Sequence, residues 1–144
     1  MKYLLDSNVL RYYSAGHETL LKNLARVPKS DVVLPLIVVI EQIRGRYDAV
    51  LKAEPHNLLK EQERLLAAET LLSEFQVFYL TEETIKELQA LMQKIKTKKR
   101  YADVVIAAMA RATGLIVVTR NVEDFKDLLP AMKIQNWIDQ NYSN

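Results

Sequence analysis

The sequence predicts an α/β fold with a parallel sheet covered by helices on both faces. Short apolar segments alternate along the chain with longer segments in which apolar residues recur at helical spacing. Strands that alternate with helices in this way form parallel sheets. A chain of 144 residues is long enough for one domain with a sizeable core and too short for two. We therefore expect a single domain over residues 1–144.

The predicted strands are short runs of β-branched, aromatic and leucine side chains. The most distinct is Leu115-Ile116-Val117-Val118-Thr119, which follows Gly114. A strand that starts at Met1 stops abruptly at the carboxylate of Asp6. The full set of predicted strands covers residues 1–5, 31–34, 77–80, 115–119 and 132–134.

The predicted helices are bounded by glycine, proline and capping residues. Two long ones, at residues 36–52 and 57–74, are expected to form an antiparallel hairpin beside the sheet. Residues 36–40, the start of the first, are apolar on all sides and are expected to be buried. The other predicted helices cover residues 8–13, 17–26, 81–95 and 104–113. Residues 101–103 are expected to open the helix 104–113. One helical turn is expected after residue 120, and Trp137 and Ile138 are expected to anchor a final helix.

Composition excludes several classes of protein. The chain has no cysteine, so it has no disulfide framework, thiolate metal site or cysteine nucleophile. No apolar stretch approaches the length of a membrane span, and Asp6 interrupts the N-terminal run before it reaches the length of a signal-peptide core. We expect a cytoplasmic protein. The net charge of +2 permits a nucleic-acid partner without indicating one.

Three isolated carboxylates in apolar surroundings are candidate site residues: Asp6, Glu41 and Asp103. Asn121 and Asp124 follow the strand 115–119. In a parallel sheet the carboxyl ends of the strands share one edge, which places Asp6 beside the segment that holds Asn121 and Asp124. Glu41 and Asp103 reach that edge only if their helices pack beside the first strand.

A cluster of these acids would need a cation. Two unit charges about 4 Å apart repel by roughly 4 kcal/mol at an effective dielectric constant near 20. Oxygen ligands favour Mg²⁺ or Mn²⁺, and neither His17 nor His56 has a ligand partner nearby in the sequence. Such an ion activates water and stabilises charge on a phosphoryl oxygen.

Each acid also has a purely structural interpretation. Asp6 is a favoured helix N-cap, Asp103 complements a helix dipole, and Asp124 can cap the last short helix. Glu41 needs a partner inside its apolar helix, and a buried arginine serves as well as a metal ion. The combination and order of the four acids carry the functional interpretation.

With these residues the chain resembles the PIN-domain nucleases, and within them the VapC-like toxins of type II toxin–antitoxin systems. The resemblance covers nearly the whole chain. It is carried by Leu4-Leu5-Asp6-Ser7-Asn8-Val9, by Glu41, by Asp103-Val104-Val105-Ile106-Ala107-Ala108-Met109-Ala110 and by Val117-Val118-Thr119-Arg120-Asn121-Val122-Glu123-Asp124-Phe125.

The resemblance implies a five-stranded sheet with the first strand central, and cleavage of RNA by a Mg²⁺- or Mn²⁺-dependent endoribonuclease. By motif position, Asp6, Glu41 and Asp103 are metal ligands and catalytic residues. Asn121 stands where many members carry the fourth acid, and Asp124 is the nearby acid that could substitute for it. Met109 is a further departure from the family pattern.

Candidates for substrate binding lie close to the acids in sequence. The run 94–100 holds five cations in seven residues, which would guide a phosphate backbone or simply complement a helix end. The candidates are Ser7, Asn8, Arg11, Lys98, Lys99, Arg100, Thr119 and Arg120.

The resemblance also implies a homodimer and a cognate antitoxin protein, for which the helix pair 36–52 and 57–74 offers a groove with a leucine-rich stripe. Two alternatives stay open: a housekeeping RNA-processing nuclease with the same site, and a non-catalytic binding module, because Asn121 replaces an acid. The RNA target, the cleavage site, the number of ions and the identity of the antitoxin are not encoded in any motif.

Overall fold

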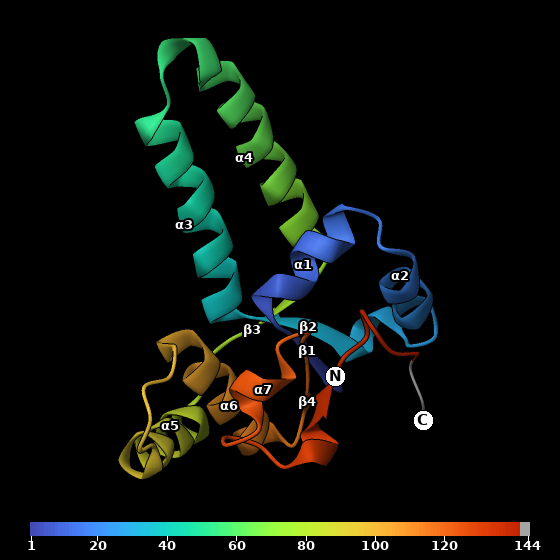
Figure 1. Ribbon diagram of the computed structural model, residues 1–144, viewed down its shortest axis with the longest axis vertical. Coiled ribbons are helices and arrows are strands. Elements are labelled where there is room, and N and C mark those ends of the chain that lie inside the picture. The colour runs from blue at the N-terminus through green and yellow to red at the C-terminus, as the bar shows by residue number, and fades with distance from the viewer. Residues whose placement is uncertain (142–144) are drawn as a thin grey trace.

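The computed structural model describes residues 1–141 of the chain (Figure 1). A five-stranded parallel sheet has the order β3-β2-β1-β4-β5, with β1 at its centre. This confirms the predicted α/β class, strand number and central first strand. The strands are β1 (Tyr3–Leu5), β2 (Val32–Pro35), β3 (Gln76–Phe78), β4 (Ile116–Val118) and β5 (Ile134–Gln135).

The helices cover both faces of the sheet. The chain runs outward from β1 through β2 to β3 and then returns to pair β4 with the other side of β1. Right-handed crossovers in these two opposite directions place α1–α4 on one face and α5–α7 on the other (Figure 1). The helices are α1 (Ser7–Ser14), α2 (Glu18–Ala25), α3 (Leu36–Lys52), α4 (Leu58–Ser73), α5 (Glu82–Lys94), α6 (Tyr101–Thr113) and α7 (Val122–Phe125), with 3₁₀ turns at Lys29–Asp31, Pro55–Asn57 and Ala131–Lys133.

Helices α3 and α4 form the predicted antiparallel hairpin, and its far end projects away from the sheet (Figure 1). The prediction that residues 36–40 are buried is wrong. Only Val38 is buried, and Ile40 is 49% exposed. The reason is that α3 leaves the sheet after its first turn, so it has neighbours on only one side.

Two predictions near strand ends are also corrected. The last strand is Ile134–Gln135, because residues 131–133 form a 3₁₀ turn after Pro130. The third strand ends at Phe78, and the next two residues are exposed beyond the sheet edge.

The predicted final helix at Trp137 does not form. The Asn136 side-chain oxygen accepts hydrogen bonds from the backbone N–H groups of Ile138 and Asp139, which closes a turn instead. Trp137 is buried against Tyr3, with ring centroids 4.7 Å apart. It therefore stabilises the end of the chain from within a turn.

The topology fixes the place of the site. Strands β1 and β4 are neighbours, and the chain leaves them toward opposite faces of the sheet. Ligands of open α/β sheets bind at such a switch point, outside the carboxyl ends of the strands. Asp6 directly follows β1 and Thr119 directly follows β4 at this edge. Within residues 1–141, no helix has the length and apolar character needed to cross a membrane.

Candidate acidic site

Asp6 is buried and held in one orientation. Its Oδ1 accepts a hydrogen bond from the Ser7 N–H at 2.8 Å, so Asp6 is the N-cap of α1, as its structural interpretation predicted. Its Oδ2 accepts from Asn8 Nδ2 and from the Thr119 hydroxyl, each at 2.8 Å. The capping role therefore leaves the carboxylate in a defined position at the edge of the sheet, where it is also available to a ligand.

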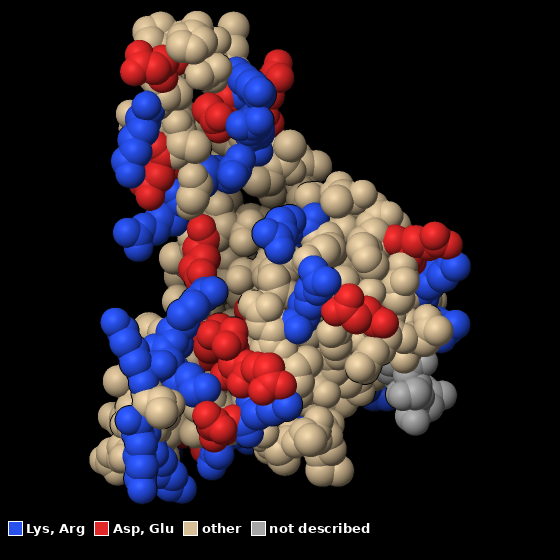
Figure 2. Space-filling model, in the orientation of Figure 1, with Lys and Arg blue, Asp and Glu red and all other residues tan. Residues whose placement is uncertain are grey.

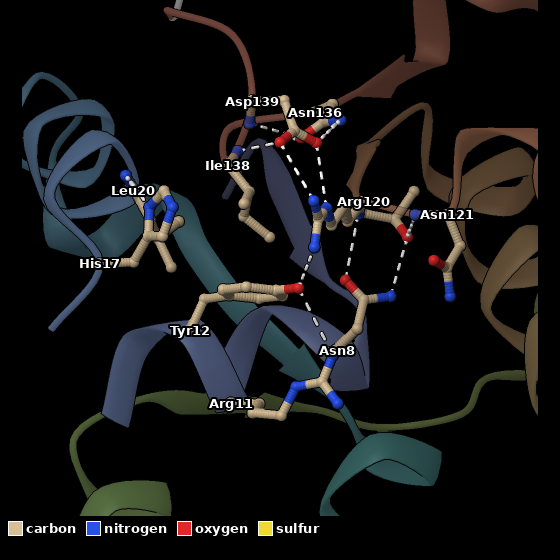
Figure 3. A network of polar contacts seen from close by, with 11 residues as sticks. Asn8, Arg11, Tyr12, His17, Leu20, Arg120, Asn121, Asn136, Ile138 and Asp139 are labelled. Carbon is tan, nitrogen blue, oxygen red and sulfur yellow. Dashed lines mark hydrogen bonds and ion pairs between the residues drawn. The ribbon is translucent and has the colours of Figure 1, made fainter. Parts of the chain in front are cut away.

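Asn8 and Thr119 link the ends of β1 and β4. Asn8 Nδ2 also donates to Thr119 Oγ1, and Asn8 Oδ1 accepts from the Arg120 N–H at 3.0 Å (Figure 3). Thr119 Oγ1 accepts from the Asn121 N–H at 3.0 Å. Thr119 is fully buried, and its hydroxyl donates to Asp6. These contacts favour a positioning role for Asn8 and Thr119 over the substrate contact suggested by the sequence.

Asp103 lies in the first turn of α6, and only 4% of its surface is exposed. The pKa of its carboxyl is raised from 3.8 to about 6, chiefly by burial; the charges of Asp6, Asp124 and Glu41 contribute to this rise, and the charge of Arg100 opposes it. Carboxylates influence each other in this way only when they share a region of low dielectric constant. The three other acids singled out in the sequence thus act electrostatically on Asp103.

Glu41 is the acid of the four that has a buried carboxylate oxygen without a hydrogen-bond partner among the described residues. Its Oε2 accepts a hydrogen bond from Arg100 at 2.9 Å, and the side chain is about one-third exposed. Its other carboxylate oxygen, Oε1, is buried and has no hydrogen-bond partner among the described residues. A buried carboxylate oxygen without a partner is costly, so this atom is suited to a cation.

Asn121 and Asp124 flank the start of α7, and both are exposed. Asn121 occupies the N-cap position, so the prediction that Asp124 caps this helix is wrong. Both residues remain candidates for the fourth position around an ion.

The donor set fits a hard divalent cation. The candidate ligands are all oxygen atoms, one of them is buried without a partner, and the pKa of Asp103 is raised by the other acids. The unpartnered oxygen and the raised pKa both indicate a region with excess negative charge, which a cation would neutralise. Within residues 1–141, no three acid or histidine groups already stand in a ligand arrangement around one point. Glu41 would have to exchange Arg100 for the ion.

The three basic candidates of the run 94–100 differ in exposure and in their ion pairs. Lys98 is exposed, and Arg100 binds Glu41. Lys99 is largely buried and forms an ion pair with Asp127 at 3.3 Å, so it is less suited than Lys98 to bind a substrate phosphate.

Arg120 belongs to a contact network that the sequence did not reveal. Its guanidinium donates to the Asp139 carboxylate and to the Tyr12 hydroxyl, which also accepts from Arg11 (Figure 3). This network attaches the turn at residues 136–139 to α1 and to the residue that follows Thr119. No sequence signal could have shown it, because Tyr12 and Arg120 lie 108 positions apart.

A cavity of about 650 Å³ lies next to the acids, between α1 and the α3–α4 hairpin. Ser7, Asn8, Asn121 and Arg100 form the wall that it shares with the acidic site. The sequence interpretation missed four polar residues in its lining, Ser14, Gln42, Arg46 and Arg64. The sequence offers only a weak indication of these residues, namely the helical spacing of polar side chains on neighbouring helices.

Comparison with known proteins identifies the family of this fold. The family model described as PIN domain matches residues 3–128. A search of curated proteins finds no match.

Solved structures of toxin–antitoxin complexes have the same fold. A DNA-bound VapBC from Salmonella typhimurium is 23% identical, with 95% of this chain and 98% of that chain covered and a TM-score of 0.75. VapBC-1 from nontypeable Haemophilus influenzae is 19% identical, with the same shares covered and a TM-score of 0.74. A toxin–antitoxin complex from Klebsiella pneumoniae is 22% identical, with 98% and 100% covered and a TM-score of 0.68.

Proposed function

The chain belongs to the PIN domain family, and we propose that it is a metal-dependent endoribonuclease that acts as the toxin of a type II toxin–antitoxin pair. One observation carries the enzymatic part of this proposal. Asp103 is buried at the switch point of the sheet, and its pKa is raised by this burial and by the charges of Asp6, Asp124 and Glu41. A protein that keeps four acids so close has a use for a cation.

Asp6, Glu41 and Asp103 would hold Mg²⁺ or Mn²⁺, with Asn121 or Asp124 in the fourth position. When bound, such an ion supplies an activated water molecule and stabilises the charge that develops on a phosphoryl oxygen. The chain's own contribution is orientation. Thr119 and Asn8 fix the Asp6 carboxylate, and Asp103 loses its proton more readily when positive charge is near.

We propose RNA as the substrate, which basic side chains around the acids would guide by its phosphates. Lys98 is exposed, and Arg11 and Arg100 line the cavity beside the acids. Figure 2 shows basic side chains on the hairpin and again at the lower left of the same face, with an acidic patch beside the lower group. A polyanion lying across this face would have its phosphates held near the acids.

The partner that we propose is a cognate antitoxin docked on the α3–α4 hairpin. The similar solved structures are described as toxin–antitoxin complexes. Leu59 is 74% exposed and Leu66 is 53% exposed, and both lie on α4. An amphipathic segment would cover these leucines. We also expect a homodimer that acts in the cytoplasm.

The decisive experiment is cleavage of a mixed RNA pool by the purified, partner-free protein in Mg²⁺, Mn²⁺ or EDTA. Wild type should cleave only with metal, and Asp6→Asn and Asp103→Asn should each lose activity. Glu63→Gln, on the exposed surface of α4, is the matched control and should cleave normally. Circular dichroism would verify that every variant folds. An inert wild type that also binds no metal in calorimetry would contradict the enzymatic proposal and favour the non-catalytic module.

A second experiment separates a toxin from a housekeeping nuclease with the same site. Expression of the wild type in its native host should arrest growth, and Asp6→Asn should not. Growth that continues despite demonstrated RNA cleavage would favour the housekeeping enzyme.

A further inference from the structure

We propose that the cavity between α1 and the α3–α4 hairpin is a nucleotide subsite that receives one unpaired base of an RNA strand and the phosphate next to it. The inference rests on the proposed function, since it takes RNA as the substrate. It adds a place where the enzyme would hold and select the strand beside the cut.

Four arginines line this cavity, and together they come from three separate elements and one loop. They are Arg11 on α1, Arg46 on α3, Arg64 on α4 and Arg100 just before α6. None of the described residues that line the cavity is an acid. Arginine donors arranged around a cavity without carboxylates are suited to bind phosphate oxygens.

The arginines differ in how much of their charge is already neutralised. Arg64 is paired with Glu61 at 2.8 Å and Arg100 with Glu41 at 2.9 Å. Among the residues described, the Arg11 guanidinium has polar contacts only with the Tyr12 hydroxyl and ring. Arg46 is half-buried, and within residues 1–141 it has no ion pair or side-chain hydrogen bond. A half-buried guanidinium that lines an open cavity and has no partner is suited to bind an anion.

Part of the remaining lining is apolar and offers a surface to a base. Its aliphatic members are Leu10, Ala67, Ala68, Leu71 and Leu72. Gln42 adds an amide that can both donate and accept hydrogen bonds at the edge of a base. A volume of about 650 Å³ is within the range of small-molecule sites and accommodates a nucleotide. Unpaired RNA bases are commonly held in this way, between apolar or guanidinium surfaces.

The position of the cavity favours RNA over an acidic peptide. Its wall includes Asn8, which holds Asp6, and Arg100, which holds Glu41. A strand with a base in the cavity would therefore have its neighbouring phosphodiester at the acids. An acidic peptide in the same place could pair with the arginines, but it would have no planar base to pack on the aliphatic part of the lining.

The test measures binding without cleavage. The probe is a short fluorescein-labelled single-stranded RNA of mixed sequence, titrated by anisotropy in EDTA with the full-length Asp6→Asn protein. Adding Arg46→Ala should weaken binding by about tenfold and reduce the slope of log affinity against log salt by about one. Arg44→Ala is the matched control: it lies on the same helix, is 81% exposed at its side chain and does not line the cavity. It should change binding less than twofold.

A second variant examines the base separately from the phosphate. Ala67→Trp fills the cavity from an exposed position on α4 and leaves all charges unchanged. It should weaken binding of the ordinary RNA but not of an abasic strand of the same length, whereas Arg46→Ala should weaken both.

The outcomes separate this inference from the proposed function. Equal effects of Arg46→Ala and Arg44→Ala would overturn the subsite even if the wild type cleaves RNA. Loss of antitoxin binding in Arg46→Ala with unchanged RNA affinity would overturn it in favour of an acidic peptide. If RNA binds through Arg46 but the wild type never cleaves, the subsite stands and the nuclease proposal fails.

Discussion

At the scale of single residues, two interpretations that competed in the sequence turn out to be compatible. Asp6 is both a helix N-cap and one member of a group of interacting acids. Glu41 does pair with an arginine, but Arg100 is exposed and leaves one carboxylate oxygen without a partner. Residue type and apolar surroundings were sufficient to select these acids. They could not show which oxygen of each carboxylate already accepts a hydrogen bond within the protein.

The raised pKa of Asp103 predicts a pH-dependent stability in EDTA. The folded pKa is about 6 and the ordinary value is 3.8, so the folded protein binds this proton more tightly than the unfolded chain. The contribution of Asp103 to stability is therefore fully present below about pH 4 and is lost as the pH rises through 6. The loss should be about 3 kcal/mol.

Urea denaturation from pH 4 to pH 7.5 measures this contribution. Asp103→Asn should lack this part of the pH dependence and should be more stable than the wild type at pH 7 without metal. Glu63→Gln should follow the wild type. Parallel pH profiles for wild type and Asp103→Asn would show that Asp103 ionises normally.

Thr119→Val should disturb the position of Asp6 without changing side-chain volume. The substitution removes the donor to Asp6 Oδ2 and the acceptor for Asn8 Nδ2 and the Asn121 N–H. Lost buried hydrogen bonds of this kind cost about 1 to 3 kcal/mol, so the urea midpoint should fall and metal-dependent cleavage should weaken through kcat. Thr70→Val on α4, whose hydroxyl donates to the Leu66 carbonyl at the surface, is the control. An unchanged kcat would assign the Thr119 hydroxyl to stability alone.

At the scale of elements, local signals predicted helices better than strand ends. The bounds of α3 agree with the prediction, because Pro35 opens the helix and the apolar spacing continues to Lys52. The last strand and the final helix were misplaced, since β5 depends on pairing with β4 and the Asn136 turn depends on a side-chain hydrogen bond. Hydrophobic periodicity within a short stretch of sequence reveals neither strand pairing nor a side-chain hydrogen bond.

Two glycines in helical segments should respond oppositely to alanine. Gly114 ends α6 with φ +75°, a left-handed conformation, so Gly114→Ala should destabilise the protein by about 1 kcal/mol or more. Gly45 lies inside α3, where an added Cβ meets no atom within 4 Å, so Gly45→Ala should stabilise it by up to about 1 kcal/mol. Urea unfolding of both variants measures the difference. Destabilisation by Gly45→Ala would show that α3 needs this glycine for another reason.

At the scale of the whole molecule, the site is assembled from segments more than a hundred residues apart. The parallel sheet made one part of this predictable, because the ends of β1 and β4 had to meet at one edge. The cavity and the Tyr12–Arg120–Asp139 network depend on how the hairpin and the last turn pack against α1. Such packing has no periodic signature, so neither feature could be predicted from the sequence.

The exposed leucines of the hairpin provide a last prediction about the whole assembly. Leu59 and Leu66 are seven positions apart on α4, so they lie on one face, and both are more than half exposed. Exposed apolar side chains on a projecting hairpin are suited to a partner. The double variant Leu59→Ala/Leu66→Ala should weaken antitoxin binding by about tenfold or more in calorimetry, while RNA cleavage without antitoxin stays normal.

The matched control is Met92→Ala/Met132→Ala, which removes two exposed apolar side chains away from the hairpin. It should leave antitoxin affinity unchanged, because Met92 lies on α5 on the opposite face of the sheet. If both double variants bind the antitoxin like the wild type, the hairpin leucines are not its docking surface. If only the methionine variant loses affinity, the antitoxin docks on the α5 side, and the nuclease site would be inhibited from the face opposite the hairpin.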